Sequence, residues 1–182
     1  MGNASSMVYQ ENNNSLYRVH YDRYKYEENK KLLDIFSILS DKDKNIMIDY
    51  IASSLCNSWN SEFNLFLISL QDTNINDIIK DNLRINLGIV NEGKNTSTLE
   101  KFKYIENIIS SVDKEILEFY SLDYDEKDNI INEKVESFVE NGDFKTYLFL
   151  NTLLKNADNM FQRVSNSLEK AISSRKYRLT NN

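Results

Sequence analysis

The chain has 182 residues and a formal net charge of −6, with 41% hydrophobic and 27% charged residues. This composition is typical of one soluble globular domain and is too apolar for an intrinsically disordered chain. No stretch approaches the ~20 consecutive apolar residues of a membrane-spanning helix. The chain has no proline and only four glycines, and compact β folds use many of both in their turns. The sequence therefore predicts an all-α protein.

Taken in chain order, the predicted domains are a flexible N-terminal leader over residues 1–24, a helical bundle over 25–176 and a polar tail over 177–182. The bundle is expected to contain about five to seven helices. Its first helix spans about 25–39, because Leu32, Ile35, Phe36 and Leu39 follow a helical spacing. Ser40 and Asp43 resemble a capping pair for the helix that follows.

Apolar residues at steps of three and four continue through residues 41–71, including Trp59. The polar residues around Trp59 leave open whether this stretch is one helix or two. A turn at 72–74 precedes a helix over 75–90, which Gly93 is expected to end. Ser97 and Glu100 form a capping box for a helix that reaches about residue 122.

A further helix begins at Asp123–Asp125 and is expected to end at Gly142, after which Asp143 starts the last helix. This long C-terminal helix has a heptad-like apolar seam, formed by Tyr147, Leu150, Leu154, Ala157, Phe161, Val164, Leu168 and Ala171. The pattern is typical of a bundle's core helix. A homodimer formed through the 147–171 seam, as in a coiled coil, is the alternative.

Charge is distributed unevenly along the chain. Residues 143–182 contain seven basic and three acidic residues, whereas residues 41–142 carry a net charge of −10. Net acidity argues against a nucleic-acid partner, because binding to phosphates requires a basic surface. Arg175, Lys176 and Arg178 could contact anionic lipid or a protein partner. Alternatively, these cations complement the C-terminal end of a helix dipole.

Residues suited to catalysis or metal binding are scarce. A single histidine, His20, and a single cysteine, Cys56, cannot build a nitrogen and sulfur metal site. His20 is interpreted as a surface residue. Cys56 lies among apolar residues and is interpreted as a buried, inert thiol. The calcium-loop patterns that start at Asp41 and Asp123 both fail, with Ile46 in place of the required glycine in the first. We predict no catalytic residues, metal or cofactor.

The most specific motif lies at the N-terminus. Gly2 follows the initiator methionine and is followed by Asn3, Ala4, Ser5 and Ser6, which matches the template for N-myristoylation. The free amine of glycine attacks the acyl donor unhindered, and small residues pass through the narrow channel of the acyltransferase. The hexapeptide resembles the N-termini of acylated eukaryotic kinases and viral matrix proteins. This resemblance covers six residues and implies modification only.

Two functions follow as expectations. The first is a non-enzymatic protein-interaction module in the cytoplasm, an adaptor held reversibly at the cytosolic face of a membrane by N-terminal myristate. A single myristoyl chain gives only weak membrane binding. The alternative is a soluble virulence or host-modulating helical bundle, viral or parasitic, that captures a partner helix in a groove without lipid. Poxvirus apoptosis inhibitors are similar in size and composition, but the segment around Trp59 lacks the Gly and Arg of their Asn-Trp-Gly-Arg motif.

Overall fold

The computed structural model describes residues 26–93, 100–156 and 160–181, and within these ranges it contains helices and no strand. The all-α prediction is therefore confirmed. The described ranges hold eight α-helical segments, slightly more than the five to seven expected. They are residues 26–38, α2 (Asp41–Asn57), α3 (Ser61–Leu70), α4 (Asp77–Glu92), α5 (Lys103–Tyr120), α6 (Tyr124–Asn141), α7 (Phe144–Lys155) and α8 (Phe161–Thr180), with a short 3-10 helix, η2 (Glu100–Phe102), before α5.

The stretch over 41–71 forms two helices. Asn60 caps the second of them, since its side-chain oxygen accepts hydrogen bonds from the backbone N–H groups of Glu62 at 3.0 Å and Phe63 at 3.1 Å. Trp59 lies in the break between α2 and α3, where 68% of its surface is exposed. Its place in the apolar spacing is therefore coincidental, and it is not part of the core.

Most predicted helix ends are confirmed. Ser40 caps α2 by accepting from the backbone N–H of Asp43, and Gly93 ends α4 in the left-handed conformation. Asp123 and Glu126 form a capping box at the start of α6, which ends at the left-handed Gly142. The predicted Ser97–Glu100 box includes a residue outside the described ranges.

The prediction of a single long C-terminal helix is wrong. The structure divides it into α7, which ends before Asn156, and α8, which begins after Met160. The sequence between them contains asparagine and aspartate, which favour turns over helix interiors. Leu150 and Leu168 from the expected seam are buried inside the protein's own core, whereas 45% of Phe161 is exposed. The continuous seam on which the alternative, a homodimer, depended is thus absent from the described residues. α8 also includes the first four residues of the segment expected as a tail.

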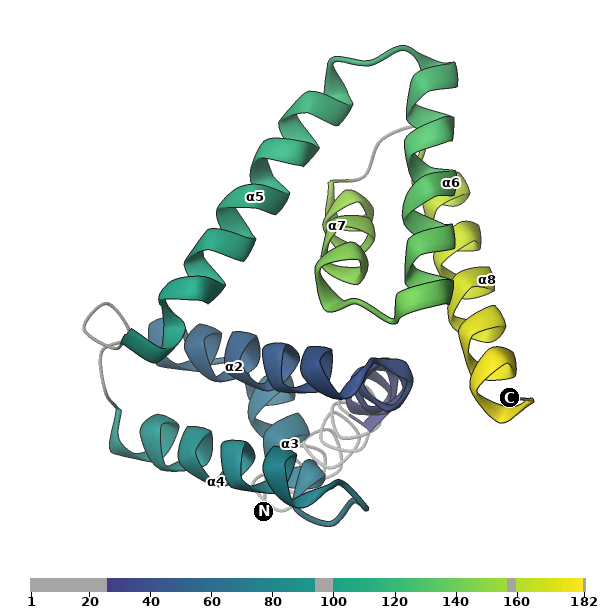
Figure 1. The fold of residues 1–182 in the computed structure, drawn as a ribbon. Coiled ribbons are helices and arrows are strands. Elements are labelled where there is room, and N and C mark those ends of the chain that lie inside the picture. The colour runs from purple at the N-terminus through teal and green to yellow at the C-terminus, as the bar shows by residue number, and fades with distance from the viewer. Residues whose placement is uncertain (1–25, 94–99, 157–159, 182) are drawn as a thin grey trace, which may run out of the picture.

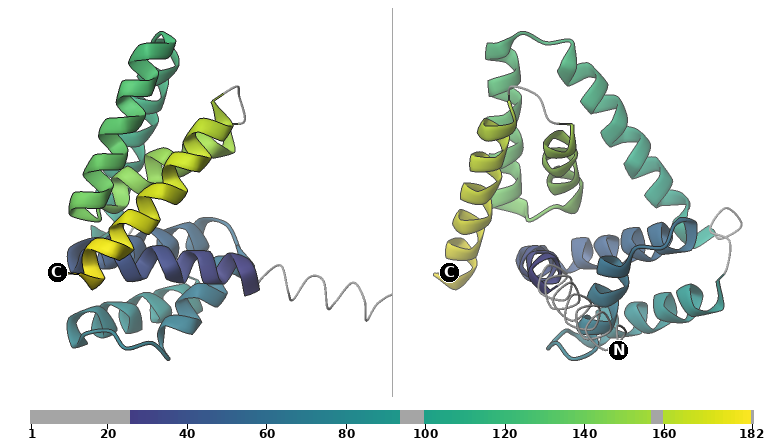
Figure 2. Two further views of the ribbon diagram at one scale, coloured as in Figure 1. Left: turned by 90° about the vertical axis from the view of Figure 1, so that its right-hand side faces the viewer. Right: turned by 180° about the vertical axis from the view of Figure 1, so that it is seen from behind.

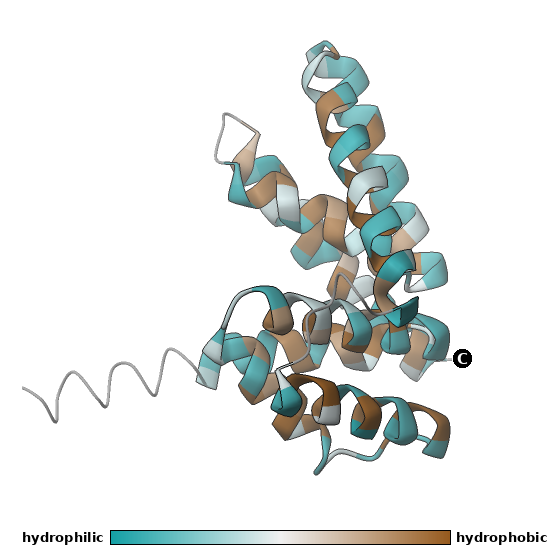
Figure 3. Ribbon diagram, turned by 90° about the vertical axis from the view of Figure 1, so that its left-hand side faces the viewer, coloured by the Kyte–Doolittle hydropathy of each residue, from teal (hydrophilic) through white to brown (hydrophobic). Residues whose placement is uncertain are grey.

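The helices form two groups. The segment 26–38, α2, α3 and α4 make up one group, drawn in the lower half of Figure 1, in which α2 packs against α3 and α4. α5 extends away from this group, and after a turn α6 runs back toward it (Figure 1). α7 lies between α5 and α6, and α8 packs against α6 and α7, as the views in Figure 2 also show. Polar and apolar residues alternate around the helices, as expected for amphipathic elements (Figure 3).

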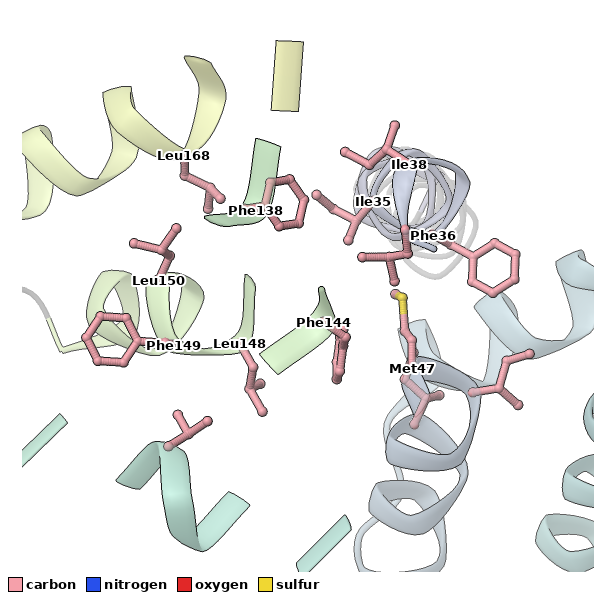
Figure 4. Close-up of a cluster of buried hydrophobic side chains, with 14 of the residues drawn as sticks. Ile35, Phe36, Ile38, Met47, Phe138, Phe144, Leu148, Phe149, Leu150 and Leu168 are labelled. Atoms are coloured by element: carbon pink, nitrogen blue, oxygen red, sulfur yellow. The ribbon is translucent and has the colours of Figure 1, made fainter. Parts of the chain in front are cut away.

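One continuous hydrophobic core joins the two groups. Phe144, at the start of α7, is 2% exposed and lies close to Met47 of α2 and the segment 26–38 (Figure 4). Leu150 of α7 and Leu168 of α8 point toward each other in the same view. α7 therefore places its side chains against both groups, so the two groups share one set of buried contacts.

Burial predicts that truncation destabilises the protein strongly at one residue of the expected seam and only slightly at another. Leu150 has no exposed surface, so Leu150→Ala should lower the free energy of unfolding by ~2–5 kcal/mol through lost burial and a new cavity. Phe161 is about half exposed, so Phe161→Ala should change the free energy of unfolding by less than ~1.5 kcal/mol. Urea unfolding of the two variants checks this. Equal effects would show that the two positions do not differ in burial.

Candidate binding groove

A cavity of about 480 Å³ opens between the two helix groups. We call it the groove. One wall is formed by the segment 26–38, α2 and α3, and the other by α7 and α8. Its size lies in the range of about 300–1,000 Å³ that is typical of binding pockets. Its apolar lining consists of Leu32, Ile35, Met47, Ile51, Phe63, Phe144, Leu148, Leu154, Leu168 and Ile172.

The apolar lining has a buried and an accessible part. Ile35, Met47 and Leu148 are buried at the floor of the groove, where they belong to the core. Leu32 and Leu154, with Phe63 and Ile172, are only partly buried and pack against that core from outside. Because these four side chains keep apolar surface in contact with water, a ligand that covered them would gain hydrophobic stabilisation.

Charged side chains surround the groove. Four are acidic and two are basic: Glu28, Lys31, Asp34, Glu62, Lys155 and Glu169. Lys31 pairs with Glu28 at 3.1 Å, and Asp34 pairs with Lys176 at 3.7 Å. Glu62 and Glu169, on opposite walls, make no ion pair within the described part of the chain, and the same holds for Lys155. The rim is therefore net negative, with two carboxylates available to a ligand.

Neutral polar groups also line the groove. Burial raises the pKa of Tyr147 to about 12, and the ionised form of Tyr50 and the carboxylate of Glu28 add to that rise. Burial and the charge of Asp113 likewise raise the pKa of Tyr50. Both phenols therefore remain protonated at neutral pH and can donate hydrogen bonds. The side chains of Asn151 and Ser165 also line the groove, and no described residue forms a hydrogen bond with either.

The predicted basic cluster near the C-terminus does not form one surface. Arg175 is 8% exposed, and its guanidinium donates to the carbonyl oxygens of Ile38 at 2.9 Å, Val139 at 3.2 Å and Glu140 at 2.9 Å. Burial and the nearby Arg178 lower the pKa of Arg175. The expectation that Arg175 contacts a membrane or partner is corrected, because its side chain is buried against the C-terminal ends of two other helices.

The other two cations of that cluster are exposed. Lys176 lies near Asp34 at the edge of the groove, and Arg178 lies in the last turn of α8. A membrane or partner contact by Lys176 and Arg178 stays a prediction. The lipidation site Gly2 and its context, Asn3, Ala4, Ser5 and Ser6, lie outside the described residues, as does His20.

A second polar cluster lies between α2, α4 and α5. The buried carboxylate of Asp49 accepts from Asn82 at 3.1 Å, from Asn86 at 2.8 Å and from the hydroxyl of Tyr104, and Lys101 lies 3.4 Å away. Burial and the hydrogen bond to Asp49 raise the pKa of Tyr104. Since its neighbours already satisfy the carboxylate, we interpret this cluster as a structural link between helices.

Other candidates for chemistry are few. Cys56 is a free thiol of intermediate exposure, and burial raises its pKa, which disfavours the reactive thiolate. Within the described ranges, no three His, Cys, Asp or Glu side chains are grouped to hold a metal ion. None of the described helices is long and apolar enough to span a membrane.

Comparisons with known proteins identify no relative of this chain. The chain matches no protein-family model, and no curated protein and no solved structure matches it. The fold and the groove are therefore the basis for any functional proposal.

Sequence reasoning missed the groove. Its accessible apolar residues, such as Leu32 and Leu154, follow the same helical spacing as core residues, so no local signal separates the two. Its rim carboxylates are ordinary surface acids in the sequence. Only the packing of residues that are more than 100 positions apart, such as Glu62 and Glu169, brings them to one opening.

Proposed function

We propose that the protein is a non-enzymatic interaction module that binds an amphipathic partner helix in the groove. The observation that carries this proposal is the groove itself, with accessible apolar side chains on both walls. A helix laid into such a groove inserts apolar side chains at positions i, i+3, i+4 and i+7, which cover the apolar surface that water otherwise contacts.

The charge of the rim indicates the kind of helix. Glu62 and Glu169 lie on opposite walls and lack ion-pair partners among the described residues. Lysine or arginine side chains on either flank of a bound helix could pair with them. The net charge of −6 also favours encounter with a basic segment. We therefore expect the partner helix to carry basic residues beside its apolar face.

The predicted acylation of Gly2 belongs to the same proposal. A myristoyl chain would hold the module reversibly at a membrane face, because one such chain binds a bilayer only weakly. The alternative expected from the sequence, a host-modulating bundle without lipid, uses the groove in the same way and differs only in the tether.

Two designed peptides test the partner class. Both carry the same leucine and isoleucine face at helical spacing, and their remaining positions are lysine in one and glutamate in the other. We expect the lysine peptide to bind the protein at least ten times more tightly, as measured by fluorescence anisotropy. Glu169→Lys should weaken its binding by roughly 2–30-fold, because an attraction of ~0.2–1 kcal/mol becomes a repulsion of similar size.

Glu133→Lys is the matched control. Glu133 is exposed on α6 and does not line the groove, so this variant makes the same change in net charge without affecting the site. It should bind the lysine peptide as the wild type does, apart from a small loss at low salt. If neither peptide bound, or if Glu169→Lys and Glu133→Lys had equal effects, the proposed partner site would be wrong.

A further inference from the structure

The groove begins close to the first described residues of the chain. Glu28, Lys31, Leu32, Asp34 and Ile35 of the segment 26–38 form part of its wall. Tyr26 precedes Glu28 by two residues, or about 3 Å along a helix axis. Gly2 lies 24 residues before Tyr26. Since each residue spans up to ~3.3–3.6 Å, the backbone between them can extend about 80 Å, far more than the groove requires.

We infer that the groove binds the N-terminal myristoyl chain of the same protein, so that the acyl chain and the partner helix compete for one site. This inference rests on the proposed acylation of Gly2 and on the partner site proposed above. A linear hydrocarbon chain suits a site whose accessible residues, Leu32, Phe63, Leu154 and Ile172, are aliphatic or aromatic and belong to opposite walls. A covalent tether raises the local concentration of the chain to about the millimolar range or below, depending on tether length.

The rim selects for an acyl amide over a free fatty acid. Glu62 and Glu169, the two rim carboxylates without an ion-pair partner among the described residues, would repel the carboxylate of myristic acid. The amide that links myristate to Gly2 is neutral, with one N–H donor and one carbonyl acceptor. Tyr50 and Tyr147 stay protonated and can donate to that carbonyl, and Asn151 can both donate and accept. The chemical class expected in the groove is therefore an N-acylated glycine.

Sequestration in the groove would compete with insertion into a bilayer. A single myristoyl chain binds a membrane with an association constant of only about 10⁴ M⁻¹. A groove of modest affinity can therefore hold the chain when little membrane is present. A partner helix that occupied the groove would displace the chain and promote membrane binding, which links partner capture to location.

The test uses the full-length, unacylated protein and a myristoylated peptide with the sequence of residues 2–9. Isothermal titration should show saturable binding of the acylated peptide and no binding of the same peptide without myristate. Leu154→Gln and Ile172→Gln should each weaken binding of the acylated peptide by about tenfold. Ile85→Gln is the matched control, since Ile85 is 55% exposed on α4 and does not line the groove, and it should leave the affinity unchanged.

Charge variants separate the acyl ligand from the helix. Glu169→Lys should alter binding of the neutral acyl amide by less than twofold but should strengthen binding of myristic acid several-fold. The lysine peptide should displace the acylated peptide from the wild-type protein. Circular dichroism and thermal unfolding of each variant confirm that the fold is retained.

Each failure has a distinct meaning. Absence of saturable binding by the acylated peptide, or equal affinities for wild type and both groove variants, would overturn this inference while the lysine peptide could still bind. Binding of both ligands without displacement would also overturn it, because the two would then occupy different sites. Loss of lysine-peptide binding alone would overturn the partner site and leave the acyl site in place.

Discussion

Replacing Gly142 with alanine is expected to lower the midpoint of thermal unfolding by roughly 6–20 °C. Gly142 ends α6 with a φ of +59°, a conformation that costs a residue with a side chain about 1–2 kcal/mol. A Cβ atom at this position would also lie 2.7 Å from the Nη2 of Arg175 and 2.8 Å from the carbonyl oxygen of Ile38. These contacts are too short, so the neighbouring groups must move.

The neighbours have little freedom to move. Arg175 is held by hydrogen bonds to three carbonyl oxygens, and the backbone N–H of Ser40 donates to the carbonyl of Gly142 at 3.1 Å. Displacing the guanidinium would leave the carbonyl of Ile38, whose hydrogen bond to Arg175 is buried, without its donor. We therefore expect a total cost of ~3–5 kcal/mol, and a protein of this size loses about 2–4 °C per kcal/mol.

The chain provides two matched controls. Gly93 ends α4 with a φ of +65°, but no atom lies within 4 Å of a Cβ placed there. Gly93→Ala should therefore show the backbone cost alone, about 1–2 kcal/mol. Gly88 is exposed inside α4, where Gly88→Ala should stabilise the protein by ~0.5–1 kcal/mol. If Gly142→Ala cost no more than Gly93→Ala, the contact with Arg175 would be unimportant.

The helix ends could be predicted because their causes are local. Ser40, Asp123 and Asp143 cap helices through hydrogen bonds to residues three positions ahead, and Gly142 ends a helix through its own backbone conformation. A pattern of a few residues contains the whole interaction. Such features can be identified in the sequence without knowledge of the tertiary packing.

The prediction of one long last helix failed because its cause is not local. Apolar residues continue at steps of three and four from Tyr147 to Ala171, and the spacing cannot show that α7 ends at Lys155 and that a separate helix, α8, begins at Phe161. The apolar residues of α7 and α8 face each other and the core, as Leu150 and Leu168 do. A period alone does not distinguish one helix from two that pack together.

The role of Arg175 and the position of the groove depend on distant contacts. Arg175 binds the carbonyl of Ile38, which is 137 residues away in the chain, so its spacing from Lys176 and Arg178 gave no signal of burial. The same limit applies to Glu62 and Glu169. Side chains that the fold brings together from separate helices become a site only through tertiary packing.

The predicted lipidation gives the second large effect, and Gly2→Ala tests it. If the protein is co-expressed with an N-myristoyltransferase, the wild type should carry myristate and the variant should not, because the added methyl group obstructs the attacking amine. Intact-mass spectrometry measures this directly. Asn3→Ala is the matched control, since it still fits the template and should be acylated as the wild type is.

Membrane binding should follow acylation. An association constant of about 10⁴ M⁻¹ places roughly nine-tenths of a freely exposed myristoyl protein on vesicles at ~1 mM accessible lipid. We expect the acylated wild type to sediment with vesicles up to that fraction, reduced by any chain held in the groove, and Gly2→Ala to remain in the supernatant. Leu154→Gln weakens binding of the acyl chain in the groove, so it should raise the fraction of the acylated protein that sediments with vesicles. An unmodified wild-type N-terminus, or equal sedimentation of wild type and Gly2→Ala, would remove the lipid tether from the proposed function and leave a helix-binding module.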